Sequence, residues 1–81
     1  MNINVRLNGA LAQKIGTARL RIEVANSATV NDLLVQLRQR YPYSEQILNS
    51  AVPFASGQHL SPASPLSDGQ EIALLVPVAG G

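Results

Sequence analysis

Alternation of hydrophobic and polar residues predicts the first two strands of the fold. Apolar residues occupy every second position from Asn2 to Leu7 and again from Arg19 to Val24. A period of two is typical of a strand with one buried face, so we expect the two runs to form an antiparallel pair. Between them, residues 11–15 fit one helical turn that ends at Gly16.

A helical period predicts one main helix between Thr29 and Pro42. Thr29 and Asp32 have the spacing of a capping box at the start of the helix, and Pro42 ends it. A sheet with one main helix must carry that helix on one face, so the other face is expected to stay uncovered. The apolar residues with helical spacing are Val30, Leu33, Leu34, Leu37 and Tyr41.

The second half of the chain shows shorter signals. Residues 44–49 fit a short helical turn, and residues 51–55 fit a short strand. Pro53 lacks an amide donor, which predicts a place at a sheet edge or a bulge. Ser56-Gly57 then predicts a turn, and residues 58–60 a brief return strand.

The last predicted strand, Glu71–Val78, is apolar on both faces. Such a strand is either central in a covered sheet or presents one face to a partner. If it lies centrally beside the first strand, Leu75 points to the uncovered side of the sheet. We therefore expect an interface there.

Composition narrows the class of protein. The chain has 81 residues, a length that supports one α+β domain but not a deep enzyme cleft. The absence of cysteine excludes disulfides, thiolate zinc sites and a cysteine nucleophile. A formal charge of +1 argues against a nucleic-acid partner. No signal or membrane-spanning pattern is seen, so we expect a cytoplasmic protein without a membrane partner.

Catalytic side chains are few. His59 is the single histidine and has no Asp or Glu within five residues, so it forms neither a catalytic pair nor a set of metal ligands with its neighbours. We expect no metal site and no bound cofactor. Arg6, Arg19 and Arg21 share the outward face of the first strand pair. Two interpretations of these arginines stay open, a solvated strand face and a docking patch for a partner.

The most unusual feature of the sequence is its last four residues. The last strand runs into Val78, Ala79, Gly80 and Gly81 with no polar tail after it. Without Cβ atoms, the two glycines fit a narrow channel. Four extended residues reach about 13 Å, so the carboxylate of Gly81 can enter the active site of a neighbouring protein. A carboxylate is a poor acyl donor, and this chemistry therefore requires its activation, for example with AMP.

These motifs resemble those of the ubiquitin-like β-grasp sulfur carriers, first the molybdopterin synthase small subunits and then the thiamine-pathway carriers. Residues 65–72 are similar to the Pro-Leu-x-Asp-Gly-Asp-Glu-Val turn of that family, and residues 76–81 to its Pro-Pro-Val-x-Gly-Gly tail. The chain departs from the pattern at Val76, at Ser56 and at residues 8–10. The resemblance implies a mixed sheet of four to five strands with one main helix across one face. It also implies a single domain over residues 1–81 with a flexible tail at 78–81.

The resemblance further implies a function. An ATP-dependent enzyme would adenylate Gly81, and a sulfurtransferase would convert the adenylate to a thiocarboxylate. The large subunit of molybdopterin synthase, in a heterotetramer, would supply the catalytic groups that pass sulfur to a pterin precursor. This chain would be a co-substrate without a cofactor of its own. Gly80 and Gly81 would carry the reaction, and the docking residues would be Leu75, Pro77, Val78 and Ala79, followed by Phe54, His59 and Leu60.

Three alternatives remain at this point. The chain is a thiamine-type carrier, a ubiquitin-like modifier that Gly81 joins to a lysine, or a binding module without a reactive end. Recovery of Gly81 on lysines of other proteins would establish the modifier. A gain in intact mass of about 16 Da, for oxygen replaced by sulfur, would distinguish a carrier from a plain binding module.

Overall fold

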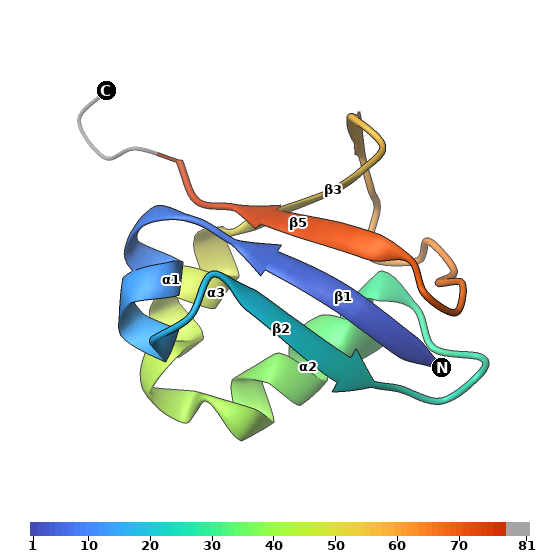
Figure 1. Ribbon diagram of the computed structural model, residues 1–81, viewed down its shortest axis with the longest axis horizontal. Helices are drawn as coiled ribbons and strands as arrows, with labels where there is room; N and C mark the ends of the chain where they lie inside the picture. The colour runs from blue at the N-terminus through green and yellow to red at the C-terminus, as the bar shows by residue number, and fades with distance from the viewer. Residues whose placement is uncertain (78–81) are drawn as a thin grey trace.

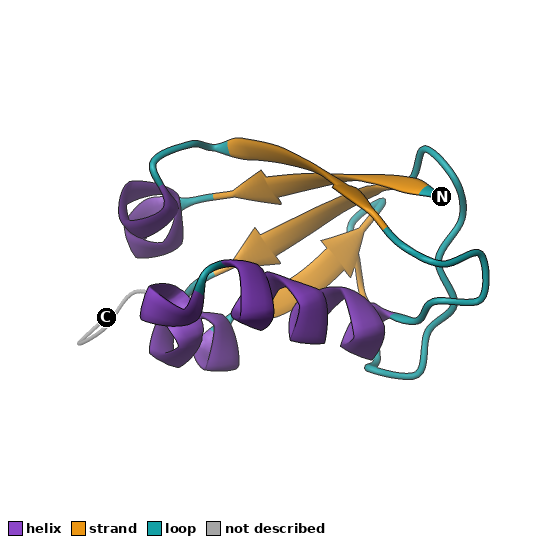
Figure 2. Ribbon diagram, turned by 90° about the horizontal axis from the view of Figure 1, so that it is seen from below, coloured by secondary structure: helices purple, strands orange, loops and turns teal. Residues whose placement is uncertain are grey.

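The computed structural model describes residues 1–77, which form one mixed sheet with helices on one side (Figure 2). The strands lie in the order β2-β1-β5-β3-β4, and β5 runs parallel to β1 while the other pairings are antiparallel. This is the β-grasp arrangement that the sequence predicts. In chain order the elements are β1 (Asn2–Leu7), α1 (Gly9–Ile15), β2 (Arg19–Glu23), α2 (Val30–Arg40), the 3-10 helix η1 (Pro42–Ser44), α3 (Glu45–Ser50), β3 (Val52–Ala55), β4 (Gln58–His59) and β5 (Glu71–Leu75) (Figure 1).

The first two strands pair as their alternation predicts. Ile3 lies opposite Ile22, and both side chains are fully buried on the side of the helices. The connection between the strands is longer than one turn, because α1 covers seven residues. Gly16 ends α1 with a φ of 96°, a left-handed conformation that glycine adopts without a steric penalty.

Helix α2 begins at the predicted capping box. The amide of Asp32 donates to Thr29 Oγ1 at 3.3 Å, and the amide of Thr29 donates to Asp32 Oδ2 at 2.9 Å. The helix lies across one side of the sheet (Figure 2), where its apolar face meets the buried face of the strands. The buried core consists of Ile3, Val5, Leu7, Leu11, Ile22, Val24, Ala28, Val30, Leu33, Leu34, Leu37, Leu48, Leu66, Ile72 and Leu74.

The prediction that Pro53 lies at a sheet edge is wrong. Strand β3 lies between β5 and β4, and Pro53 pairs with Leu74 of β5. The carbonyl of Pro53 accepts from the amide of Leu60 at 2.9 Å, so the missing donor of Pro53 faces the β4 side. The ladder between β3 and β4 has only two residue pairs, and Pro53 comes directly before the first of them. The proline therefore removes one backbone hydrogen bond, at the end of that ladder.

The hairpin from β3 to β4 turns at Ser56 and Gly57, as predicted. Their φ angles are 51° and 75°, the left-handed values that a two-residue hairpin turn requires at both positions. Ser56 is the only residue other than glycine with a positive φ among those described.

Strand β5 lies in the middle of the sheet, between β1 and β3, and ends at Leu75 instead of the predicted Val78. Leu7, the last residue of β1, pairs with Leu74, and Val52, the first residue of β3, pairs with Leu75. Beyond Leu75 neither neighbour offers a strand partner. The ladder stops there, and the chain leaves the middle of the sheet rather than its edge.

Candidate functional site

The side of the sheet that faces away from the helices carries an exposed apolar area over β5 and β3. Leu75 pairs with Val52, and Ala73 pairs with Phe54, so the four side chains share this face. Leu75 is 41% exposed, whereas Ile72 and Leu74, which alternate with Ala73 and Leu75 along β5, are fully buried on the helix side. We call Val52, Phe54, Ala73 and Leu75 the apolar half of the open face.

His59 extends the apolar half at its outer edge. It lies opposite Phe54 in the hairpin, and the two rings have centroids 5.5 Å apart. Leu60 does not join them, because it is half-buried and packs against the hydrophobic core. The structure thus brings the predicted residues Leu75, Phe54 and His59 to one face, and places Leu60 on the other side of the hairpin.

The chain leaves the sheet through a tethered segment beside α1. The amide of Val76 donates to Oδ1 of Asn8 at 3.1 Å. Asn8 is the N-cap residue of α1, yet its side chain caps no helix amide and bonds instead to a residue 68 positions away. Val76 and Pro77 line a shallow, mainly apolar groove with Gly9 and Ile47. Val76 is therefore held against the domain, and Pro77 is exposed.

The predicted reactive residues follow directly after this segment. Val78, Ala79, Gly80 and Gly81 lie outside the residues that the structure describes. The open face and the tethered segment precede them in the chain.

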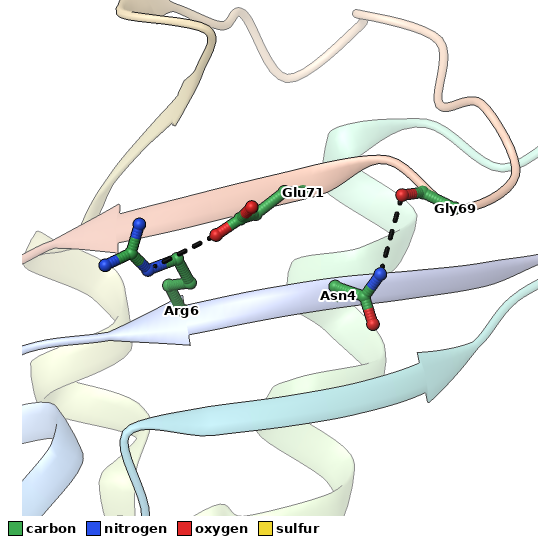
Figure 3. Close-up of polar contacts among 4 residues, drawn as sticks. All are labelled: Asn4, Arg6, Gly69 and Glu71. Atoms are coloured by element: carbon green, nitrogen blue, oxygen red, sulfur yellow. Dashed lines mark hydrogen bonds and ion pairs between the residues drawn. The ribbon is translucent and has the colours of Figure 1, made fainter.

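Polar side chains occupy the part of the open face over β1 and the start of β5. Arg6 Nε lies 3.3 Å from Glu71 Oε1, and Nδ2 of Asn4 donates to the carbonyl of Gly69 at 3.5 Å (Figure 3). Both side chains of the ion pair are more than half exposed, so solvent screening leaves it little effect on stability. The open face therefore divides into an apolar half over β5 and β3 and a polar half over β1 and β2.

Residues 1–77 offer little for catalysis or metal binding. No group of three or more His, Asp or Glu side chains gathers there in a way that could hold a metal ion. His59 contacts an aromatic ring rather than a carboxylate. None of the helices in this part of the chain is long and apolar enough to cross a membrane. What these residues present to another molecule is a surface and the origin of a C-terminal segment.

Sequence reasoning missed two residues of this site, Asn8 and Val52. An asparagine before a helix is ordinarily interpreted as a cap, and nothing local signals a bond to Val76. Val52 begins a short strand whose neighbour in the sheet is set by the fold. Only the register between β3 and β5 places Val52 beside Leu75.

The profile of one protein family, ThiS, matches residues 5–81. The chain belongs to the ThiS family. Over its full length it is also 36% identical to the molybdopterin synthase sulfur carrier subunit of Mycobacterium tuberculosis, and it covers 99% of that protein.

Solved structures of other proteins share the fold of this ThiS-family chain over all of its length, and two of them bear on its function. SAMP1 of Haloferax volcanii, a small archaeal modifier protein, superposes with a TM-score of 0.88 at 26% identity. A chain of the complex of subunits 1 and 2 of the molybdopterin-converting factor from Helicobacter pylori superposes with a TM-score of 0.71 at 26% identity. In both comparisons the match also covers 100% of the other chain.

Proposed function

We propose that this chain is the sulfur carrier subunit of a molybdopterin synthase and that its reagent is the C-terminal carboxylate of Gly81. The observation that carries the proposal is the 36% identity, end to end, with the M. tuberculosis protein of that name. The open face supports it, because an exposed apolar area beside the exit of the C-terminal segment suits a protein that presents its terminus to a partner.

The chemistry begins with activation. A carboxylate oxygen of Gly81 attacks the α-phosphate of ATP on an activating enzyme, pyrophosphate leaves, and an acyl-adenylate forms. A sulfurtransferase then delivers sulfur at the oxidation level of hydrosulfide, which attacks the acyl carbon and displaces AMP. The product is a thiocarboxylate on Gly81, whose sulfur is a far better nucleophile than the original oxygen.

Delivery depends on a second protein. The large subunit docks on the apolar half, receives residues 78–81 in its active site and supplies the groups that transfer sulfur to the pterin precursor. The H. pylori protein that resembles this chain was solved in complex with the second subunit of its converting factor, which supports such a partner. Water supplies the oxygen that replaces the transferred sulfur on the acyl carbon, so the carboxylate is regenerated at each turnover and the chain acts as a co-substrate.

Intact mass spectrometry of the protein purified from its own host tests the proposal. A carrier is expected to contain a fraction about 16 Da heavier than the sequence mass, which disappears after incubation with the large subunit and the pterin precursor. A Gly81-truncated variant purified in parallel is the control and should lack the heavier form. Absence of the heavier form from wild-type protein under all growth conditions would contradict the proposal.

A second candidate is a protein modifier joined to lysines through Gly81, and the likeness to SAMP1 favours it. Here the acyl-adenylate is attacked by a lysine amine, and an isopeptide bond forms. Tryptic peptides that carry the C-terminal residues on a lysine would support this reading. A third candidate, a thiamine-type carrier, shares the thiocarboxylate but passes its sulfur to a different acceptor, so assays with the two acceptors separate it.

A further inference from the structure

Three arginines lie together on the polar half of the open face. Arg6 of β1 is directly opposite Arg19 of β2, and Arg21 follows two residues along the same strand, opposite Asn4. The three side chains are exposed, and all point away from the core because Val5, Leu20 and Ile22 alternate with them. We call Arg6, Arg19 and Arg21 the arginine cluster.

The cluster is only partly neutralised. Like charges directly opposite each other on antiparallel strands are destabilising, and Arg6 and Arg19 form such a pair. Glu71 pairs with Arg6 at 3.3 Å, but within residues 1–77 the side chains of Arg19 and Arg21 form no salt bridge. Glu23 shares the face at the far end of β2, opposite Asn2. The fold thus tolerates an unfavourable placement of charge at this spot.

The position of the cluster ties it to the surface described above. Arg6 lies beside Ala73 in the parallel pairing of β1 with β5, so the cluster borders the apolar half directly. Arg6 and Arg19 also lie toward the end of the sheet at which β5 ends, whereas Arg21 lies level with Glu71 at the start of β5. A partner that contacts the apolar half and receives the C-terminal segment is therefore expected to contact the arginine cluster as well.

The shape of the surface suits carboxylates. A shallow hollow between β1 and β2 is lined by Asn4, Arg6, Arg19, Arg21 and Glu71. Guanidinium groups donate in a planar fork that matches a carboxylate with two parallel hydrogen bonds. The guanidinium groups of Arg19 and Arg21 form no salt bridge within residues 1–77, and the cluster to which they belong borders the apolar half. They therefore fit a partner protein whose Asp or Glu side chains border an apolar patch.

We propose that the arginine cluster docks on an acidic strip of the large subunit, next to the pocket that receives the C-terminal segment. The cluster steers association and sets the register of the complex, while the apolar half supplies the desolvated contact. This inference rests on the proposed function, because it names the chemistry of the surface that the same partner presents.

Charge reversal in the cluster tests the inference. The protein carrying Arg19→Glu and Arg21→Glu is mixed with the purified large subunit from the same organism in a stopped-flow instrument at several salt concentrations. The expected result is an association rate constant about tenfold lower at low salt, and a much weaker dependence of that constant on salt than wild type shows. The matched control carries Lys14→Glu and Arg40→Glu, which change the net charge equally on helices that lie on the other side of the sheet (Figure 2).

The outcomes separate the two proposals. If wild type and both double variants associate at the same rate with the same salt dependence, the inference is wrong and the proposed function stands. If wild-type protein does not bind the large subunit at all, the proposed function fails. Circular dichroism of both double variants checks that they are folded, so that a lower association rate is not caused by unfolding. Two other results would contradict an acidic protein surface as the partner of the arginine cluster. One is self-association of the protein and the other is binding of a labelled RNA oligonucleotide, if either is lost only in the variant carrying Arg19→Glu and Arg21→Glu.

Discussion

At the scale of single residues, Leu75 is the most exposed large apolar side chain of the open face. It stands at the end of β5, next to Val52 and one residue before the tethered Val76. Exposure of a leucine is common on protein surfaces, and by itself it needs no explanation. Its neighbours on the face and its closeness to the exit of the chain are what connect Leu75 with docking.

Leu75→Glu is expected to weaken binding to the large subunit by at least tenfold, about 1.4 kcal/mol, because it places an unpaired charge in a desolvated contact. Isothermal titration calorimetry measures the dissociation constant. Val35→Glu is the matched control, since Val35 on α2 is 40% exposed and Leu75 is 41% exposed. An equal loss in both variants would show that the open face is not the interface.

Asn8 stands directly before α1 but bonds to a residue at the other end of the chain. Its side-chain oxygen accepts the amide of Val76, which is the last hydrogen bond that holds the chain before residues 78–81.

Asn8→Ala should speed amide hydrogen exchange at Val76 by about fivefold, because the hydrogen bond contributes roughly 1 kcal/mol to keeping that amide closed. Asn8→Asp keeps an acceptor at the same place and should retain the protection. NMR exchange rates at single residues measure the effect. Equal rates at Val76 in wild type and Asn8→Ala would contradict the tether.

At the scale of elements, α2 is the piece of the fold that local sequence specifies best. The capping box satisfies amides at its start, and the apolar spacing supplies a face that covers the sheet. Because the signals are local, they do not depend on which distant segment packs against the helix. The short strands β3 and β4 have no comparable local signal and take their positions from the sheet around them.

Thr29→Ala is expected to lower the free energy of unfolding by about 1 kcal/mol, since it removes the oxygen that accepts from the amide of Asp32. Thr29→Ser retains that oxygen and should stay within about 0.5 kcal/mol of wild type. Urea denaturation followed by circular dichroism gives both values. A full loss in the serine variant would mean that Thr29 stabilises the protein through its methyl group instead.

At the scale of the whole molecule, the central place of β5 decides how the C-terminus is presented. A strand between β1 and β3 is anchored on both sides, so residues beyond it emerge from a rigid base. The apolar half and the arginine cluster lie on the same side of that base. One partner can therefore contact both and receive the chain end in a defined register.

One extra alanine after Gly81 is expected to abolish sulfur transfer while the melting temperature stays the same. The added residue moves the carboxylate off the position where it reacts, but it touches none of the contacts in residues 1–77. Conversion of the pterin precursor with the large subunit measures transfer. An extension that a site-specific protease can remove provides the control, because cleavage should restore activity. Wild-type conversion by the uncut extended protein would rule out the role of the terminus.

The elements that the sequence predicts correctly are those whose signals are local. The alternation from Asn2 to Leu7, the capping box at Thr29 and the turn at Ser56-Gly57 each involve residues close in the chain, where backbone geometry and short-range bonds decide the outcome. The apolar character of residues 71–75 on both faces left two places open for β5, the middle of a covered sheet or a face against a partner, and the sheet places it between β1 and β3.

The tertiary structure alone decided the features that depend on register between distant segments. The interior place of Pro53, the end of β5 at Leu75, the bond from Val76 to Asn8 and the pairing of Val52 with Leu75 all join residues far apart in the chain. No local pattern encodes such a partner, because it is chosen by the way the sheet closes over its core. Sequence by itself determined which residues could form the site, and the register of the sheet determined which of them meet.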